Sequence, residues 1–229
     1  MTMVPKEIVD LGHTMFHNMP NIGGAAVAFW PVNSFDELET LSDGKLSMES
    51  RMMLLPEHCG THLDVPRHCT RGATDVANVP LERLVLPGHL LDLTHRQNGE
   101  AITIADLEAA AEASGRAVQP GTALLVWAGV EDDWGKPGFT LQRPYVPTET
   151  ANWLVEQDIA LFGTDLIGMD DPTEWWWPTH RVWLEANICM VQQMCNLGAL
   201  VGKEFLFVAA PLKLRDGTGC PVRPIALVM

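Results

Sequence analysis

Apolar segments of strand length alternate with helical segments through the middle of the chain, and this alternation limits the folds open to it. Thr103 begins an alanine-rich helix that ends at Gly115, and a second helix is expected over residues 147–157. Three segments have the composition of strands, and the last two are continuous apolar runs of the buried kind: residues 90–94, 122–127 and 159–163. We therefore predict an α/β fold.

The N-terminal part carries two further local signals. Ser34 and Glu37 have the spacing of a capping box, which predicts a short helix over residues 35–41. Apolar and polar side chains alternate over residues 46–54, a period typical of a strand. We expect this strand to lead the chain into the segment that carries most of its chemistry.

Length and composition favour one globular unit. The chain has 229 residues, 47% of them hydrophobic, which is ample for a buried core. No linker, repeat or low-complexity tract divides it, so we predict a single domain over residues 1–229.

The charge and cysteine content exclude several classes of function. Lys and Arg number 15 against 29 Asp and Glu, a formal charge of −14 that disfavours nucleic acid and anionic membranes as partners. No segment has the pattern of a signal peptide or the length of a membrane span. Five cysteines, without a C-x-x-C pair, do not suggest a disulfide framework, and a reducing cytoplasm is the expected location.

Residues 57–68 concentrate titratable side chains more than any other stretch; they read Glu57-His58-Cys59-Gly60-Thr61-His62-Leu63-Asp64-Val65-Pro66-Arg67-His68. Gly60 and Pro66 argue against a helix. In an extended chain His62 and Asp64 point to one side, whereas His58 would lie about 13 Å from His62. A kink at Gly60 would close that gap, because glycine adopts backbone angles that other residues avoid.

Two imidazoles and a carboxylate form a mixed nitrogen and oxygen site for a divalent first-row metal. His58, His62 and Asp64 would leave one coordination position open, as in catalytic sites. We interpret His68 as the proton-transfer residue, since histidine titrates near neutrality. Any one of these histidines alone would fit a structural or surface role, but the cluster favours a site. Cys59 is expected to pack inward as a small hydrophobic residue.

The same run resembles the H-x-G-T-H-x-D-x-P-x-H signature of the metal-dependent cyclase-like hydrolases. The endings at residues 209–212 and 217–223 also resemble that family, most closely its isatin-hydrolase branch. The resemblance implies a swivelling β/β/α domain that assembles as a homodimer or higher homo-oligomer. It also implies that His58, His62 and Asp64 bind the metal and that His68 is the catalytic acid and base.

A substitution in the second half of the chain bears on the number of metal ions. In the two-metal formamidase branch a histidine and a glutamate twelve residues later complete a second site, and here His180 is followed by Gln192. A neutral amide does not offset a second dication as a carboxylate does. The resemblance thus implies one Mn²⁺ or Zn²⁺ per chain, with Gln192 as a possible additional ligand. His180 is then available as a second catalytic residue, to hydrogen-bond substrate or assist proton transfer.

Aromatic residues are candidates for the substrate pocket. Three consecutive tryptophans at residues 175–177 could form an aromatic wall or lid over a flat substrate, with Trp175 and Trp176 chosen as pocket residues. A subunit-interface anchor is an equal alternative. The resemblance places an aromatic contact near the N-terminus, where Trp30 or Phe29 could serve, with core packing as the alternative. Asp165 matches the family's Gly-x-Asp element and is expected to be structural or to orient a ligand histidine.

These observations predict a metal-dependent hydrolase that opens a small cyclic amide or lactone through a metal-activated water. One alternative is an N-formylkynurenine formamidase with two metals. Another is a non-catalytic metal-binding relative, against which the intact His68 argues. The expected partners are a small-molecule substrate and further copies of the chain.

Overall fold

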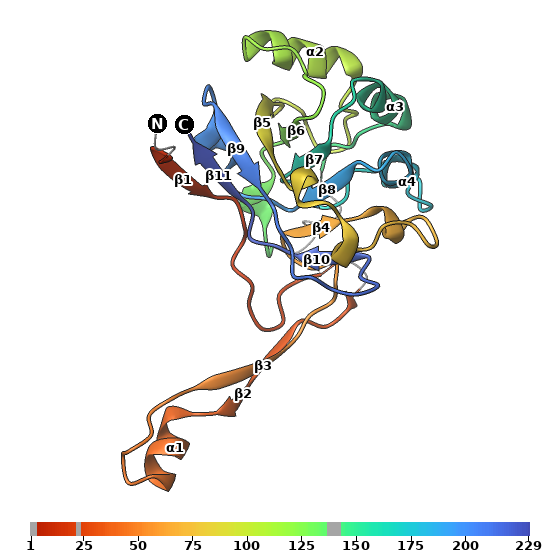
Figure 1. The fold of residues 1–229 in the computed structure, drawn as a ribbon. Coiled ribbons are helices and arrows are strands. Elements are labelled where there is room, and N and C mark those ends of the chain that lie inside the picture. Colours follow the sequence, from red (N-terminus) through yellow and green to blue (C-terminus); the bar gives the residue numbers. More distant parts are fainter. Residues whose placement is uncertain (1–3, 22–23, 137–142) are drawn as a thin grey trace.

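The computed structural model describes residues 4–21, 24–136 and 143–229. Figure 1 shows a curled sheet with helices on one side and a long arm that projects from it. The larger sheet has nine strands in the order β1-β11-β9-β5-β6-β7-β8-β4-β10. They are β1 (Glu7–Asp10), β4 (His62–Asp64), β5 (Val85–Asp92), β6 (Ala123–Trp127), β7 (Leu161–Thr164), β8 (Cys189–Gln192), β9 (Phe205–Val208), β10 (Gly219–Pro221) and β11 (Ile225–Val228).

The middle of this sheet confirms the predicted α/β class. Strands β5, β6, β7 and β8 are parallel neighbours, and the flanking strands pair antiparallel. The helices that connect them are α2 (Ile104–Ala113), α3 (Thr148–Glu156) and α4 (Pro178–Glu185). Thr103 caps α2 in a capping box with Asp106, as the sequence predicts for a helix beginning there.

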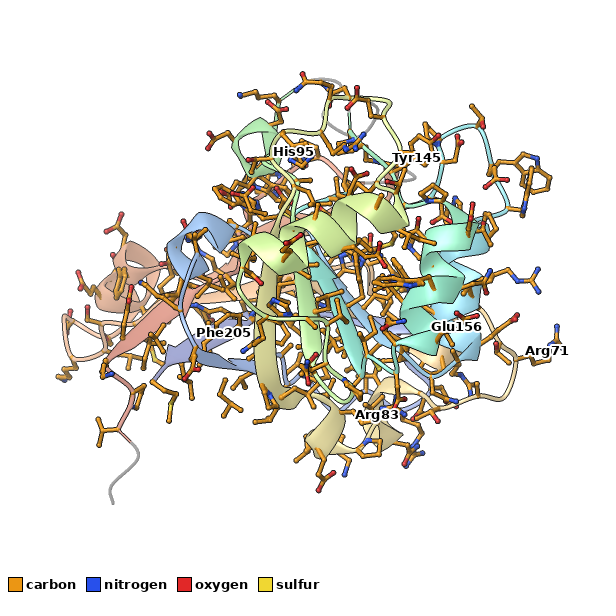
Figure 2. All side chains as sticks on the ribbon, turned by 90° about the horizontal axis from the view of Figure 1, so that it is seen from above. Arg71, Arg83, His95, Tyr145, Glu156 and Phe205 are labelled. Atoms are coloured by element: carbon orange, nitrogen blue, oxygen red, sulfur yellow. The ribbon has the colours of Figure 1, made fainter. Side chains whose placement is uncertain are left out.

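The helices bury one face of the parallel strands, and Figure 2 shows them lying over the sheet. Trp183 of α4 is fully buried and stacks on Phe162 of β7 with ring centroids 4.2 Å apart. Leu124 of β6 belongs to the same cluster, whereas Leu125 faces a second core beneath the sheet. Both faces of the parallel strands are therefore buried, which accounts for their continuous apolar composition.

The arm comprises residues 28–54 and consists of β2 (Ala28–Asn33), α1 (Phe35–Leu41) and β3 (Ser50–Leu54). The predicted helix over 35–41 is confirmed, with Ser34 accepting from the backbone N–H of Glu37. The strand expected over 46–54 forms only from Ser50, where β3 pairs with β2 in a separate two-stranded sheet. The arm extends away from the large sheet (Figure 1).

None of the helices in the described part of the chain is long and apolar enough to cross a membrane.

Candidate functional site

Strand β4 carries His62 and Asp64 at the centre of the site. It lies between β8 and β10 in the sheet. His62 pairs with Gln192 of β8, and Asp64 pairs with Gly219 of β10. As alternation predicts, His62 and Asp64 share a face, while Leu63 enters the core on the other face. Both polar side chains are buried, so their partners define what they can do.

The kink predicted at Gly60 is present. Gly60 has φ +59°, in the left-handed region that favours glycine, and the rings of His58 and His62 approach to 5.4 Å between centroids. Cys59 is fully buried with Met19 and Val27, as expected for a small hydrophobic residue. The turn thus brings two histidines of one short segment to the same carboxylate.

Contacts on one side of its ring fix the orientation of His58. The hydroxyl of Thr218 donates to Oε2 of Glu57 over 2.5 Å, so its oxygen accepts from Nε2 of His58, 2.9 Å away. Nδ1 of His58 therefore faces Oδ1 of Asp64 at 2.6 Å. Gly219 leaves room for this ring, because a Cβ at that position would lie 2.4 Å from Cε1 of His58.

His62 presents its other nitrogen to the same carboxylate. Its Nδ1 lies 2.7 Å from the carbonyl oxygen of Gly60, which accepts only from a protonated nitrogen. Nε2 is then an unprotonated acceptor, 3.4 Å from Oδ1 of Asp64. Burial lowers the pKa of His62, against the raising influence of Asp64, and favours this neutral form.

The charge balance around Asp64 suits a cation. Burial raises the pKa of the Asp64 carboxyl, but the neighbouring imidazoles of His62 and His58, the latter also through its hydrogen bond, more than offset this and hold that pKa below its usual range. Burial lowers the pKa of His58, whereas its hydrogen bond to Asp64 and that carboxylate's charge raise it, with a net rise. An ion bound here would displace the proton shared by His58 and Asp64.

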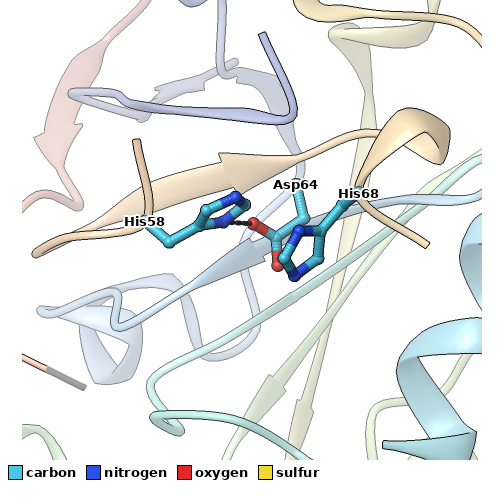
Figure 3. Close-up of side chains that lie close together, drawn as sticks. All are labelled: His58, Asp64 and His68. Carbon is cyan, nitrogen blue, oxygen red and sulfur yellow. Dashed lines mark hydrogen bonds and ion pairs between the residues drawn. The ribbon is translucent and has the colours of Figure 1, made fainter. Parts of the chain in front are cut away.

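His68 completes the cluster from a 3-10 helix, Pro66–His68, that follows β4. Figure 3 shows His68 beside Asp64 and His58, and one potential ligand atom from each of the three lies within 4.8 Å of the others. Burial lowers the pKa of His68 to about 4, with Asp64 opposing it and the other histidines adding to it. Among the described residues neither ring nitrogen of His68 has a hydrogen-bond partner.

The donor set fits a divalent first-row metal, and in the described part of the chain the group whose ligand atoms all lie within 4.8 Å of one another contains His68 and not His62. His58 and Asp64 belong to this group and also to the set predicted from sequence, which His62 completes. The hydrogen bond to Gly60 fixes the lone pair of His62 toward Asp64, whereas His68 is held by ring contacts, the nearest with His58 at 4.0 Å between centroids, and by no hydrogen bond to a described residue.

His180 reaches the site from α4 with a fixed tautomer. Its Nδ1 donates to Oδ2 of Asp170, so Nε2 is an acceptor. Nε2 of Gln192 lies 3.0 Å from that acceptor and also donates to Oδ2 of Asp64, while Oε1 of Gln192 accepts from the N–H of Gly168 over 2.8 Å. The amide nitrogen of Gln192 thus bridges Asp64 and His180, and its oxygen, the atom expected as an additional ligand, is bonded elsewhere.

One cavity of about 440 Å³ is lined by His58, His62, Asp64, His68, Asp170, His180 and Gln192. Trp175 and Trp177 line it, and the ring centroid of Trp177 lies 6.2 Å from that of His68 and 5.8 Å from that of His180. Trp176 does not line it, and its ring packs edge-on against Trp175. The wall therefore comes from Trp175 and Trp177, which corrects the choice of Trp176. Trp177 has a left-handed backbone at the start of α4.

The fold places two further predicted residues: Trp30 lies away from the cavity, and Asp165 takes the structural one of its two expected roles. Trp30 does not line the cavity, because β2 carries it out on the arm, where its side chain is partly exposed. Asp165 has a structural role: its two carboxylate oxygens accept from the backbone N–H groups of Ala128 and Val130, each over 2.8 Å. Burial raises the pKa of Asp165 to about 6. The carboxylate that orients a histidine is Asp170.

The sequence motifs give no role to Asp170, Thr218, Glu57 or Arg143, which the structure places at the site. Thr218 and Glu57 orient His58, and Arg143 lines the cavity. Thr218 lies between the glycines of the C-terminal motif, which was a usable signal, whereas nothing near Arg143 in the sequence marks it.

Fold and site together define an α/β protein with a buried histidine and aspartate centre suited to a metal ion. The family model Cyclase, described as "Putative cyclase", matches residues 9–171. The chain is 30% identical to an isatin hydrolase from Roseibium aggregatum over 202 residues, which cover 77% of this chain and 73% of that protein. It is 28% identical to a kynurenine formamidase from Bordetella petrii over 174 residues, covering 75% and 77% respectively.

A solved structure shows the same fold. The crystal structure of an isatin hydrolase bound to the product analogue thioisatinate matches with a TM-score of 0.85 at 24% identity, covering 97% of this chain and 92% of that one. The chain therefore belongs to the cyclase family, and its resemblance to the cyclase-like hydrolases is confirmed.

Proposed function

We propose that this protein is a metal-dependent hydrolase that opens a small cyclic amide or lactone. One divalent ion, manganese or zinc, would be held by His58, His62 and Asp64. The names of its relatives, an isatin hydrolase and a kynurenine formamidase, support hydrolysis of a bond between carbonyl carbon and nitrogen.

One observation carries the proposal. Two histidines, each fixed by a hydrogen bond on its far side, direct their remaining nitrogens at Oδ1 of the buried Asp64. Such convergence of acceptors is unfavourable without a proton or a cation between them. It lies in a cavity with a third histidine, His68, whose ring nitrogens bond no described residue, and substrate could meet both groups there.

Each residue of the site has a separate role in the proposed hydrolysis. When bound, a divalent ion at this centre polarises a carbonyl group and increases the acidity of water. His68, which lines the cavity beside His58 and Asp64, accepts a proton from the attacking water and returns it to the leaving nitrogen or oxygen. His180, oriented by Asp170, hydrogen-bonds the substrate or assists proton transfer once Gln192 releases its Nε2. Trp175 and Trp177 stack on a planar substrate.

Gln192 supports one ion rather than two. Its amide nitrogen fills the position between Asp64 and His180 where a bridging carboxylate would bind a second dication. The alternatives are a two-metal formamidase acting on N-formylkynurenine and a metal-binding relative without turnover.

Metal analysis combined with a substrate panel tests the proposal. Protein purified without chelators should contain about one equivalent of manganese or zinc and hydrolyse cyclic amides such as isatin, or small lactones. The variant Gln192→Glu should raise the metal content toward two equivalents. Two equivalents in the wild type would favour the formamidase, and metal without turnover would favour the binding protein. A chain that takes up no metal would refute the proposal.

The assembly we propose is a homodimer or higher homo-oligomer in which the arm contacts a second copy. On β3, Met52, Met53 and Leu54 are exposed, and α1 buries no residue. An isolated two-stranded sheet is marginal in water, so a second copy is the natural cover for these side chains. Sedimentation at micromolar concentration should show more than one chain per particle.

The free state of all five cysteines supports a reducing compartment such as the cytoplasm.

A further inference from the structure

Arg143 brings a positive charge to the cavity that contains His58 and His68. Its Nη1 donates to the backbone oxygen of Asp170 over 3.0 Å. Its Nε is buried without a hydrogen-bond partner, and none of the hydrogen bonds among the described residues uses Nη2. No described carboxylate lies within 4.0 Å of its nitrogens. The guanidinium thus retains donors that no side chain of the described part uses.

The two carboxylates whose charges act on Arg143 are engaged elsewhere. Asp170 accepts from Nδ1 of His180, and Asp171 accepts from the backbone N–H and hydroxyl of Thr173 over 2.8 and 2.7 Å. Burial lowers the pKa of the Arg143 guanidinium, and these carboxylates offset that effect only in part. A desolvated and incompletely paired cation is unfavourable, and an anionic ligand would relieve it.

Backbone contacts place this charge beside the proposed metal centre. The carbonyl of Arg143 accepts from the N–H of Gly99 over 2.9 Å. Nη2 of Arg143 lies beside Gly168, 3.5 Å from the point where a Cβ on that residue would stand. The N–H of Gly168 bonds Gln192, which in turn bonds Asp64. The guanidinium is therefore separated from the centre by one layer of residues, within the same cavity.

We propose that Arg143 binds a carboxylate of the substrate that is distinct from the carbonyl undergoing hydrolysis. A planar guanidinium suits a carboxylate, and charge-assisted hydrogen bonds are roughly twice as strong as neutral ones. This inference rests on the proposed function for the reacting end of the substrate. It narrows the preferred substrates to amides or lactones that carry a carboxylate, with Arg143 as the residue that determines this preference, so isatin, which has no carboxylate, tests the ring opening alone.

Binding of matched probes tests this without relying on turnover. Benzoate and benzamide differ in the carboxylate alone, and their binding is measured by calorimetry to the wild type and to Arg143→Gln, with and without added Mn²⁺. Arg181→Gln is the control, because Arg181 is exposed on α4 and pairs with Glu185. We expect Arg143→Gln to weaken benzoate about tenfold or more, leaving benzamide unchanged. Arg181→Gln should change neither.

The outcomes separate the possible sites of the carboxylate. Weakening of benzoate in Arg143→Gln with and without metal, with partial recovery in Arg143→Lys, supports the proposal. Benzoate binding that needs Mn²⁺ and ignores Arg143→Gln would assign the carboxylate to the ion and overturn it. Equal loss of both probes in Arg143→Gln would show a damaged cavity, and failure of the wild type to prefer benzoate would show no carboxylate site; either result overturns the proposal. None of these results depends on hydrolysis, so failure of the proposed activity is recognised separately by the substrate panel.

Discussion

The arm and the strand β4 differ in how much of their side-chain surface the rest of the chain buries. In β4 every residue is buried, including His62 at 3% exposure and Asp64 at 0%. In the arm, Met53 is 65% exposed and Leu54 is 55% exposed, although both are apolar. Contacts within the chain thus determine the geometry of the centre, whereas the arm leaves more than half of these apolar side chains exposed. We therefore expect catalysis, which a single chain can carry out, at the centre on β4, and association between chains at the arm.

The largest effect should come from His68→Ala. Because no hydrogen bond from a described residue holds the ring of His68, its loss should remove proton transfer without removing the metal. We expect kcat to fall by about 10²–10⁴ and the metal content to stay unchanged. Kinetics together with elemental analysis checks both. Unchanged turnover would exclude His68 as the acid and base, and loss of metal would make it a ligand.

A pair of leucine substitutions compares the two regions directly. Leu63→Ala in β4 creates a cavity in a fully buried core and should lower the free energy of unfolding by about 2–5 kcal/mol. Leu54→Ala in the arm should change it by no more than about 0.5 kcal/mol in a monomer. Urea denaturation at several protein concentrations measures both. A concentration-dependent cost for Leu54→Ala would show that a second chain covers the arm, and equal costs at all concentrations would remove the contrast.

The buried carboxyl of Asp165 predicts a pH dependence of stability. Its pKa is about 6 in the folded chain against 3.8 as the ordinary value, so the folded state binds this proton more tightly. The stabilisation is complete below about pH 4 and is lost as pH rises to about 6, a change on the order of 3 kcal/mol. The difference in unfolding free energy between wild type and Asp165→Asn should follow this curve. Asp43→Asn, at an exposed carboxyl of the arm, is the control; a flat difference for Asp165→Asn would contradict the prediction.

The smallest effect concerns the orientation of His58. Thr218→Val removes the oxygen between His58 and Glu57, so the ring loses the contact that directs Nδ1 to Asp64. We expect metal affinity to fall about 10–100-fold, the range found for such orienting groups. A competition assay with a fluorescent chelator measures it, with Thr94→Val as control. Equal affinities would mean that packing against Gly219 alone orients His58.

Much of the centre could be predicted because its information is local. Period-two alternation places His62 and Asp64 on one face of β4, and a single glycine explains how His58 joins them. The apolar runs of β6 and β7 likewise identified buried strands, since parallel strands covered on both faces need little polar surface.

The remaining features depend on contacts between distant segments. Alternation over residues 46–54 gave the strand character of β3 but not its pairing with β2, which leaves both faces exposed. Among three consecutive tryptophans, the backbone conformation of Trp177 selects the one that faces the histidines. Asp165 and Asp170 are both carboxylates that follow β7, and only the position of α4 determines which one meets His180.

The missing side chain of Gly219 has a consequence for attempts to transfer this chemistry. Any Cβ there would displace the ring of His58, although 161 positions separate the two residues. Grafting residues 57–68 onto another scaffold would therefore reproduce the motif without its geometry unless a glycine on an adjacent strand came with it. Equally, a motif search restricted to those residues would accept chains that have no room for the first histidine.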